Sequence, residues 1–447
     1  MKKLFFSLIS MLLIASVSFA QDASKDLKKA TRALGSYHLD PTNNLSKLEE
    51  AKELIDGAIG SELISGTAGA WIARGEIYNA LVAKEVNQLL TGLVIEDSNY
   101  KLPEDITKTA NVAVTSFTKA LGLAEKKPET NDALKGLSES ASYLNSIGND
   151  YLQKSNYQMA YEPLNAVLDI NKTVTAAGAD PVLTTADDVS NTKYVVAYCA
   201  SLAGKEAESK RIFKELIDED YQEAGVYAAY INLLMKEEGS NAQVEAVLEK
   251  GKKVFPGNTE LLFAEINYYL RQNRLEELVD KLQIAIDKEP ENPTLYSTLG
   301  NVYDQLFQKE LEAGHPEQAN ANFEAALGYY NQAVAKDSEY AEAIYSIGAL
   351  YFNKAAAVSK EMISMEDDYS REGIKKYEGL KAEMMNLFDQ ALPFFEKAEK
   401  MDPNDINTLI ALREIFARKD DVQTSNEFKA RMEKVQNGET ISESYFK

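Results

Sequence analysis

The sequence has 447 residues, 45 % hydrophobic and 26 % charged, and its 48 lysines and arginines against 70 aspartates and glutamates give a net charge of −22. A charge of this sign repels nucleic-acid phosphate and anionic lipid, so we expect neither as a partner. Cys199 is the single cysteine, and His38 and His315 are the two histidines. This excludes an intrachain disulfide, a cysteine zinc site and a multi-histidine metal centre, and leaves a folded acidic protein.

The first twenty residues have the pattern of a secretory signal peptide. Two lysines precede an apolar run over 4–19, and Ser18-Phe19-Ala20 places small residues at −3 and −1 of a cleavage site before Gln21. The alternative is an uncleaved anchor, which needs roughly 20 apolar residues, more than this run has. We predict cleavage after Ala20, which changes the charge from −22 to −24 by removing two lysines. The mature chain is then periplasmic or secreted, without stable membrane insertion.

Beyond residue 45, apolar residues recur at helical spacing, which predicts an all-α fold. A partial helical pair is expected around 45–63, carried by Leu48, Ala51, Ile55 and Ala58. Further along, Pro256 and Pro290 lie 34 residues apart and each follows a predicted helix. A 34-residue period that ends in proline is typical of tetratricopeptide repeats.

The residues inside this period resemble the tetratricopeptide motif. Tyr296, Leu299, Gly300 and Tyr303 match its first helix, and Ala326-x3-Tyr330 begins the match to its second. Further matches are Ala333; Ile344, Ile347, Gly348 and Tyr351 with Ala391, Phe395, Ala398 and Pro403; Leu144, Ile147, Gly148, Tyr151, Ala160, Leu164 and Val167; and Trp71, Gly75 and Tyr78. Ser338 stands where the motif has proline and Arg74 where it has leucine. The resemblance implies a right-handed superhelical solenoid of antiparallel helix pairs, with insertions in some repeats.

The register divides the chain into repeat units. They are expected near 68–125, 141–174, 190–223, 225–258, 259–292, 293–340, 341–405 and 406–438. Three units are long, with extra residues near 79–112, 304–318 and 354–384 that either form loops on a binding face or only lengthen helices and loops. A loop at 175–189 contains Gly178-Ala179-Asp180-Pro181 and is the expected boundary between regions 21–174 and 190–447.

Motifs for catalysis are missing from the sequence. It has no Gly-x-Gly-x-x-Gly, Walker loop, Gly-x-Ser-x-Gly or His-Glu-x-x-His. Cys199 lies among Val195, Val196 and Ala200, which favours a buried thiol over a nucleophile, and His315 sits in a Gly-His-Pro turn typical of a surface residue. We therefore expect no enzyme, no cofactor and no metal.

The resemblance also implies where a partner binds. Tetratricopeptide arrays line their concave face with the first helix of each pair, at its second, fifth, ninth and twelfth positions. Transfer by register selects Asn145, Asn149, Tyr194, Tyr198, Phe263, Asn267, Asn301, Tyr345 and Phe352. Amides pair with an extended backbone and rings supply contact area, although some of these rings could instead fill gaps between helices. The register places no lysine or arginine beside Asn145 and Asn149, which argues against a clamp for an acidic peptide.

Two functions compete at this level. The leading hypothesis is an exported, non-enzymatic scaffold that binds another envelope protein or a peptide, basic or neutral in charge. The alternative is a glycan or small-molecule binding subunit of an outer-membrane uptake system. It is weakened by the single tryptophan, Trp71, and by the absence of a cysteine for lipid attachment near residue 20.

Overall fold

The computed structural model describes residues 22–95, 100–365 and 367–447, and all its secondary-structure elements in these ranges are helices. The predicted signal peptide, residues 1–20, lies outside the described residues. The chain forms two compact units, Met1–Val247 and Leu248–Lys447, so the division falls within one helix, α11. None of the described helices combines the length with the hydropathy that a membrane span requires.

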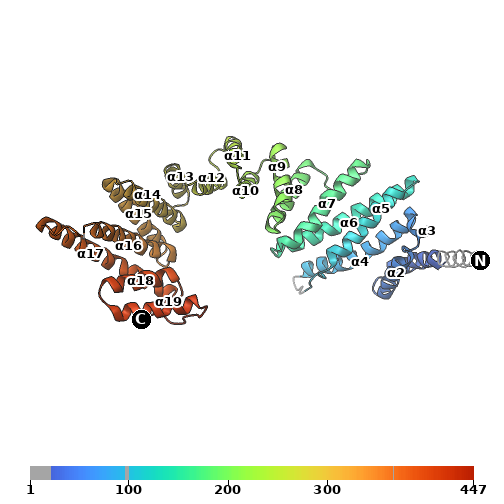
Figure 1. Cartoon of the computed structure of the whole chain (residues 1–447). Coiled ribbons are helices and arrows are strands. Elements are labelled where there is room, and N and C mark those ends of the chain that lie inside the picture. The colour runs from blue at the N-terminus through green and yellow to red at the C-terminus, as the bar shows by residue number, and fades with distance from the viewer. Residues whose placement is uncertain (1–21, 96–99, 366) are drawn as a thin grey trace, which may run out of the picture. The chain divides into compact units, whose positions relative to one another are not determined.

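The helices follow one another as pairs, and within each unit the two members of a pair pack together, as α6 with α7 in the first unit and α14 with α15 and α16 with α17 in the second (Figure 1). The first helices of the pairs are α4 (Ala68–Ile95), α6 (Lys127–Gln153), α8 (Ala186–Leu202), α10 (Ala224–Leu234), α12 (Thr259–Arg271), α14 (Pro293–Glu312), α16 (Ala341–Ile363) and α18 (Ile406–Arg418). The second helices are α5 (Ile106–Leu123), α7 (Tyr157–Ala176), α9 (Glu206–Asp218), α11 (Asn241–Val254), α13 (Leu275–Lys288), α15 (Pro316–Lys336), α17 (Arg371–Met401) and α19 (Val422–Gln436). The all-α array of tetratricopeptide-type helix pairs is confirmed, and the pair predicted at 141–174 begins earlier, at Lys127.

Glycines of the motif lie where the two helices of a pair meet. A β-carbon at Gly300 would lie 2.5 Å from Cδ1 of Tyr330, and one at Gly148 would lie 2.5 Å from Cγ of Leu164. Tyr330 and Leu164 are buried. The glycine therefore makes room for a large side chain of the second helix, which is the packing reason for the motif spacing.

One three-residue turn recurs between the helices of several pairs. Its middle residue has a positive φ, and the next backbone N–H donates to the carbonyl five residues back, as from Asn156 to Tyr151 at 2.8 Å. This is the Schellman arrangement, which satisfies free carbonyls at a helix end. The middle residues are Ser155, Gly204, Asn273, Gly314 and Asp420. The turn reverses the chain at once, so the second helix packs back on the first.

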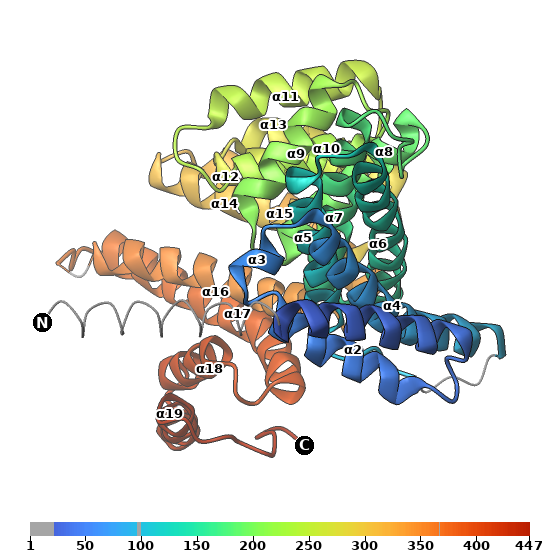
Figure 2. The ribbon, with the colours of Figure 1, turned by 90° about the vertical axis from the view of Figure 1, so that its right-hand side faces the viewer.

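The extra residues of the long units are mostly additional helical turns. In the unit 293–340, where the sequence predicts extra residues near 304–318, only residues 313–315 separate α14 from α15. In the unit 341–405, where the sequence predicts extra residues near 354–384, α16 continues to Ile363 and α17 begins at Arg371, and the two helices lie alongside each other in Figure 2. Between α4 and α5 the described residues 100–105 form a loop, while 96–99 and residue 366 lie outside the described part.

An additional helix precedes the predicted partial pair. Residues 22–39 are helical and pack on α2 (Leu45–Ala58), with Ala30 and Leu34 buried against Leu48 and Ile55. The short helix α3 (Glu62–Ser65) then leads into α4. The sequence prediction of a pair around 45–63 thus identified α2 but missed its partner.

The loop between α7 and α8 lies inside the first unit. The N–H of Leu183 in this loop donates to Oδ1 of Asn171 on α7 at 2.9 Å. A boundary at 175–189 between regions 21–174 and 190–447 stays a prediction. Cys199, in the following helix α8, has no exposed surface, and burial raises the pKa of its thiol to about 11, as expected for a structural cysteine.

Candidate partner-binding face

A groove of about 600 Å³ runs between the first helices α14 and α16 in the second unit. Both helices contribute polar, small and charged side chains to it. The lining residues are Gln308, Leu311 and Glu312 from α14, and Asn353, Ala356, Ala357, Lys360 and Glu361 from α16, with Ser364 at the end of that helix. We call this surface the α14–α16 groove.

The groove exists because both helices continue beyond the length of an ordinary repeat. On α14, Asn301 and Asp304 are followed at helical spacing by Gln308, and α14 does not end until Glu312. On α16 the same spacing continues from Phe352 to Ala356 and Lys360. The extra turns therefore extend the face that the motif register selects, and the alanine methyl groups leave open space between the helices.

Polar groups in and beside the groove provide hydrogen-bonding capacity. Gln308 and Asn353 each carry an amide with donor and acceptor atoms, and Nε2 of Gln308 donates to Oδ1 of Asp304 at 3.3 Å. Burial raises the pKa of the Asp304 carboxyl above its ordinary value, and the hydrogen bond from Gln308 opposes this effect. The charged lining residues are Glu312, Lys360 and Glu361, and Glu361 forms an ion pair with Nζ of Lys376 at 2.9 Å.

Several residues expected to contact a partner in the second unit are used in packing. Oδ1 of Asn301 accepts a hydrogen bond from the hydroxyl of Tyr330 at 2.7 Å, and its Nδ2 donates to Glu342 at 3.3 Å. The rings of Tyr345 and Phe352 pack edge-on against Phe395, with centroids 5.7 and 6.3 Å away.

Phe263 and Asn267 on α12 differ in their surroundings. Phe263 is half-buried against the core of α12 to α14, which includes Leu262 and Leu299, whereas Asn267 is exposed. Of the expected residues in this unit, Asn267 is therefore the one with an exposed side chain. The rings of Phe263, Tyr345 and Phe352 instead fill gaps between helices.

The expected residues of the first unit divide in the same way. Asn145 and Asn149 lie one turn apart on α6, both exposed, and neither makes a side-chain hydrogen bond within the described residues. On α8, Tyr194 packs against Phe213 with ring centroids 6.4 Å apart. Tyr198 is 45 % exposed and meets Tyr157 edge-on at 5.7 Å. Asn145, Asn149 and Tyr198 are thus exposed, and their role in partner binding stays a prediction.

A smaller hollow, of about 500 Å³, borders α6. It is lined by Asn131, Leu134, Lys135, Ser138 and Ser142 on α6 and by residues 179–182 of the loop before α8. Nearby, the pKa of the Glu76 carboxyl on α4 is raised, first by burial and then by Asp132 and Glu139 of α6, while Lys135 acts in the opposite direction. This part of α4 and α6 is therefore acidic, which disfavours an anionic partner.

The register did not select Gln308, Asn353, Ala356 and Lys360. Their positions lie beyond the twelfth residue of the repeat, which is the last position that the register assigns to the binding face. The signal was the continued spacing of three and four residues into the extra chain, which is the pattern of a prolonged helix.

No protein-family profile and no curated protein matches the sequence. Similar solved structures include YrrB, described as a TPR protein with an unusual peptide-binding site, at 18 % identity and a TM-score of 0.33 over 50 % of this chain and 92 % of YrrB. PilW, described as a type IV pilus biogenesis factor, is 14 % identical with a TM-score of 0.36 over 55 % of this chain and 92 % of its own. MamA from Desulfovibrio magneticus RS-1 is 15 % identical with a TM-score of 0.31, over 44 % and 94 %. The repeat type of this chain follows from its own helix packing.

Proposed function

We propose that the chain is a non-enzymatic scaffold that binds a protein or peptide segment in the α14–α16 groove. The observation that carries this proposal is the groove itself, about 600 Å³ in volume and lined by the Gln308 and Asn353 amides beside Ala356 and Ala357. An extended peptide offers one N–H and one carbonyl per residue, which side-chain amides can pair with. The alanines admit the backbone of the ligand close to α16.

The charge distribution indicates the kind of partner. The chain carries a net charge of −22, while in the groove Glu312 and Glu361 are matched by Lys360 and by Lys376, whose Nζ pairs with Glu361 at 2.9 Å. Complementary charge speeds association and suppresses wrong partners. The partner segment is therefore basic or neutral.

The proposal places the scaffold in the cell envelope. It rests on the signal-peptide pattern before Gln21, which makes the mature chain periplasmic or secreted. Mass spectrometry of the protein from envelope extract tests this, since the expected amino-terminal residue is Gln21. A chain that retains Met1 would contradict export by cleavage.

Site-specific photocrosslinking tests the groove. A photoreactive amino acid replaces Ala356, which is exposed in the groove, and in a matched variant it replaces Ala321, an exposed alanine of α15 that does not line the groove. After irradiation in envelope extract, we expect a discrete protein adduct from position 356 that is absent from position 321. The further change Ala357→Arg, which adds a bulky cation to the groove, should remove that adduct.

The other outcomes count against the scaffold. Identical adducts from both positions would show non-specific contact, and the absence of any adduct from position 356 would contradict binding at the groove. Specific binding of a defined sugar that Ala357→Arg abolishes would favour the glycan-binding alternative.

A further inference from the structure

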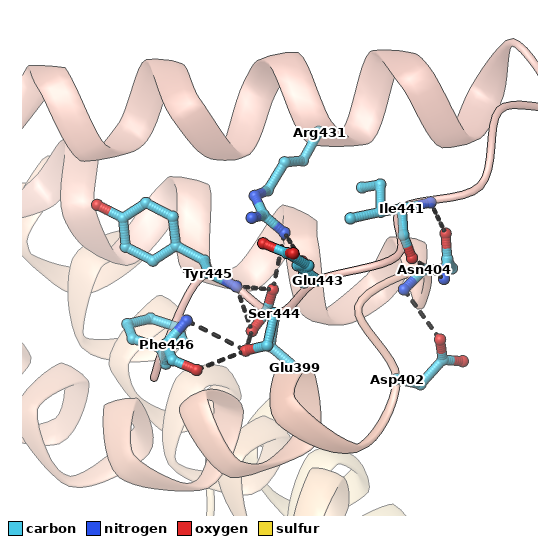
Figure 3. A network of polar contacts seen from close by, with 9 residues as sticks. All are labelled: Glu399, Asp402, Asn404, Arg431, Ile441, Glu443, Ser444, Tyr445 and Phe446. Atoms are coloured by element: carbon cyan, nitrogen blue, oxygen red, sulfur yellow. Dashed lines mark hydrogen bonds and ion pairs between the residues drawn. The ribbon is translucent and has the colours of Figure 1, made fainter.

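Residues 439–447 fold back onto the last helices. Gly438, two residues beyond the end of α19, has a φ of +82°, and the N–H of Glu439 donates to the carbonyl of Lys434 at 3.0 Å. We call residues 439–447 the closing segment. It contains no helix and lies across α19, the end of α17 and the turn before α18 (Figure 3).

Side chains hold the backbone of the closing segment. The N–H of Ile441 donates to Oδ1 of Asn404 at 2.7 Å, and Nδ2 of Asn404 donates back to the carbonyl of Ile441 at 3.1 Å. Nη1 of Arg431 donates to the carbonyl of Glu443 at 2.9 Å. A single amide that pairs with both polar groups of one residue is a recognition arrangement for a peptide backbone.

The Glu399 carboxylate provides the second anchor. This residue of α17 has no exposed surface, and its oxygens accept the N–H of Tyr445 at 2.8 and 3.1 Å, the Ser444 hydroxyl, and Nη1 of Arg431 at 3.1 Å. A buried carboxylate is costly unless it is well paired. Of these donors, only Arg431 remains when the closing segment leaves, so the site is built for a ligand that supplies an N–H and a hydroxyl.

An aromatic surface receives the side chains. Phe428 of α19 is fully buried, and its ring centroid lies 4.8 Å from that of Tyr445 and 5.7 Å from that of Phe446. Ile441 packs on the same core of α16 to α19. Four residues of the segment thus make side-chain contacts with the helices. They are Ile441 and, after two intervening residues, Ser444, Tyr445 and Phe446.

We propose that the end of the array, formed by Glu399, Asn404, Phe428 and Arg431, is a peptide-binding site, and that the closing segment occupies it in cis as its ligand. The site takes a segment of the pattern apolar-x-x-Ser-aromatic-aromatic. This site uses none of the residues that line the α14–α16 groove. Its test is therefore separate from that of the scaffold proposal.

The test starts from the full chain, with a protease recognition sequence inserted between Gly438 and Glu439. The folded protein is cut, passed through gel filtration to release the segment, and titrated with a fluorescent synthetic peptide of residues 439–447. We expect saturable binding to the cut chain, and at least tenfold weaker binding to the uncut chain, whose site is occupied. Asn404→Ala in the cut chain should weaken binding at least tenfold.

Two modified peptides test the geometry. N-methylation at Tyr445 keeps the ring but removes the N–H that Glu399 accepts, and should weaken binding at least tenfold. N-methylation at Ser442, an exposed residue with no described hydrogen bond from its N–H, is the matched control and should have little effect.

Each remaining outcome overturns the proposal. If the cut chain keeps its helical circular dichroism and does not bind the peptide, the segment is not a ligand. If cutting destroys that helical signal, the segment is an integral part of the core. Equal binding to cut and uncut chains would place the peptide elsewhere on the molecule. None of these three outcomes changes the test of the scaffold proposal, which is the crosslinking from position 356 in the α14–α16 groove.

Discussion

The missing side chain of Gly300 allows α14 and α15 to pack with the ring of Tyr330 between them. We expect Gly300→Leu to lower the free energy of unfolding by roughly 1–3 kcal/mol or more, because a β-carbon alone would lie 2.5 Å from this buried ring. Chemical denaturation monitored by circular dichroism measures the change. Gly328→Leu on α15 is the matched control, since a β-carbon at Gly328 meets nothing within 4 Å. Equal stability of both variants and the unmodified chain would refute the repeat register.

Asp304 is a second residue whose surroundings predict a measurable effect. Burial raises the pKa of its carboxyl in the folded state, so the folded chain binds more protons than the unfolded chain just above the ordinary value of 3.8. Stability therefore falls as the pH rises from that value through the raised pKa. Asp304→Asn should be more stable than the unmodified chain at neutral pH and lose this advantage towards acid. Melting temperatures of both proteins across pH 4 to 8 test this, and an advantage that grows towards acid would contradict it.

At the scale of elements, the recurring three-residue turn predicts opposite effects at two equivalent positions. Ser155 adopts a φ of +55°, which is strained for a residue with a β-carbon, whereas Gly314 adopts +76° in the corresponding turn. Ser155→Gly should raise the free energy of unfolding by about 1 kcal/mol, and Gly314→Ala should lower it by a similar amount. Nothing lies within 4 Å of a β-carbon at Gly314, so the effect there is purely conformational. Thermal unfolding of both variants checks the pair, and a change of the same sign in both would contradict it.

The helix pairs were predictable because each motif residue serves packing. Gly148 of the first helix contacts Leu164 of the second, as the motif predicts, and Gly300 and Tyr330 make the same contact in a later pair. Residues 22–39 also show helical spacing, in Ala30, Leu34 and Tyr37, but they lie ahead of the first repeat unit, so the repeat register does not reach them.

The candidate site was less predictable than the pairs. The motif predicts which positions of the first helix lie on the concave face. It does not predict whether a ring at such a position points outwards or packs against the second helix. The rings of Tyr345 and Phe352 pack on Phe395, a contact that depends on how far apart α16 and α17 lie. The α14–α16 groove depends on two neighbouring helices being long at once, which no single repeat reveals.

At the scale of the whole chain, the contacts described between helices join helices that lie one or two places apart in the sequence, within each unit. Stability in such an array is the sum of local terms, and regions open independently. Destabilising the second unit by Gly300→Leu should therefore leave α4 to α7 protected. Hydrogen exchange with mass spectrometry reads this directly, with faster exchange expected in α14 and α15. A uniform loss of protection along the chain would show instead that the molecule unfolds as one cooperative body.

The single buried thiol of Cys199 makes the folded molecule report on its own opening. With no exposed surface and a pKa of about 11, the thiol is shielded from alkylating reagents at neutral pH as long as α8 and α9 stay packed. No second cysteine competes for the reagent. The rate at which Cys199 is alkylated therefore measures how often α8 and α9 separate. The measurement needs neither an engineered label nor a known ligand.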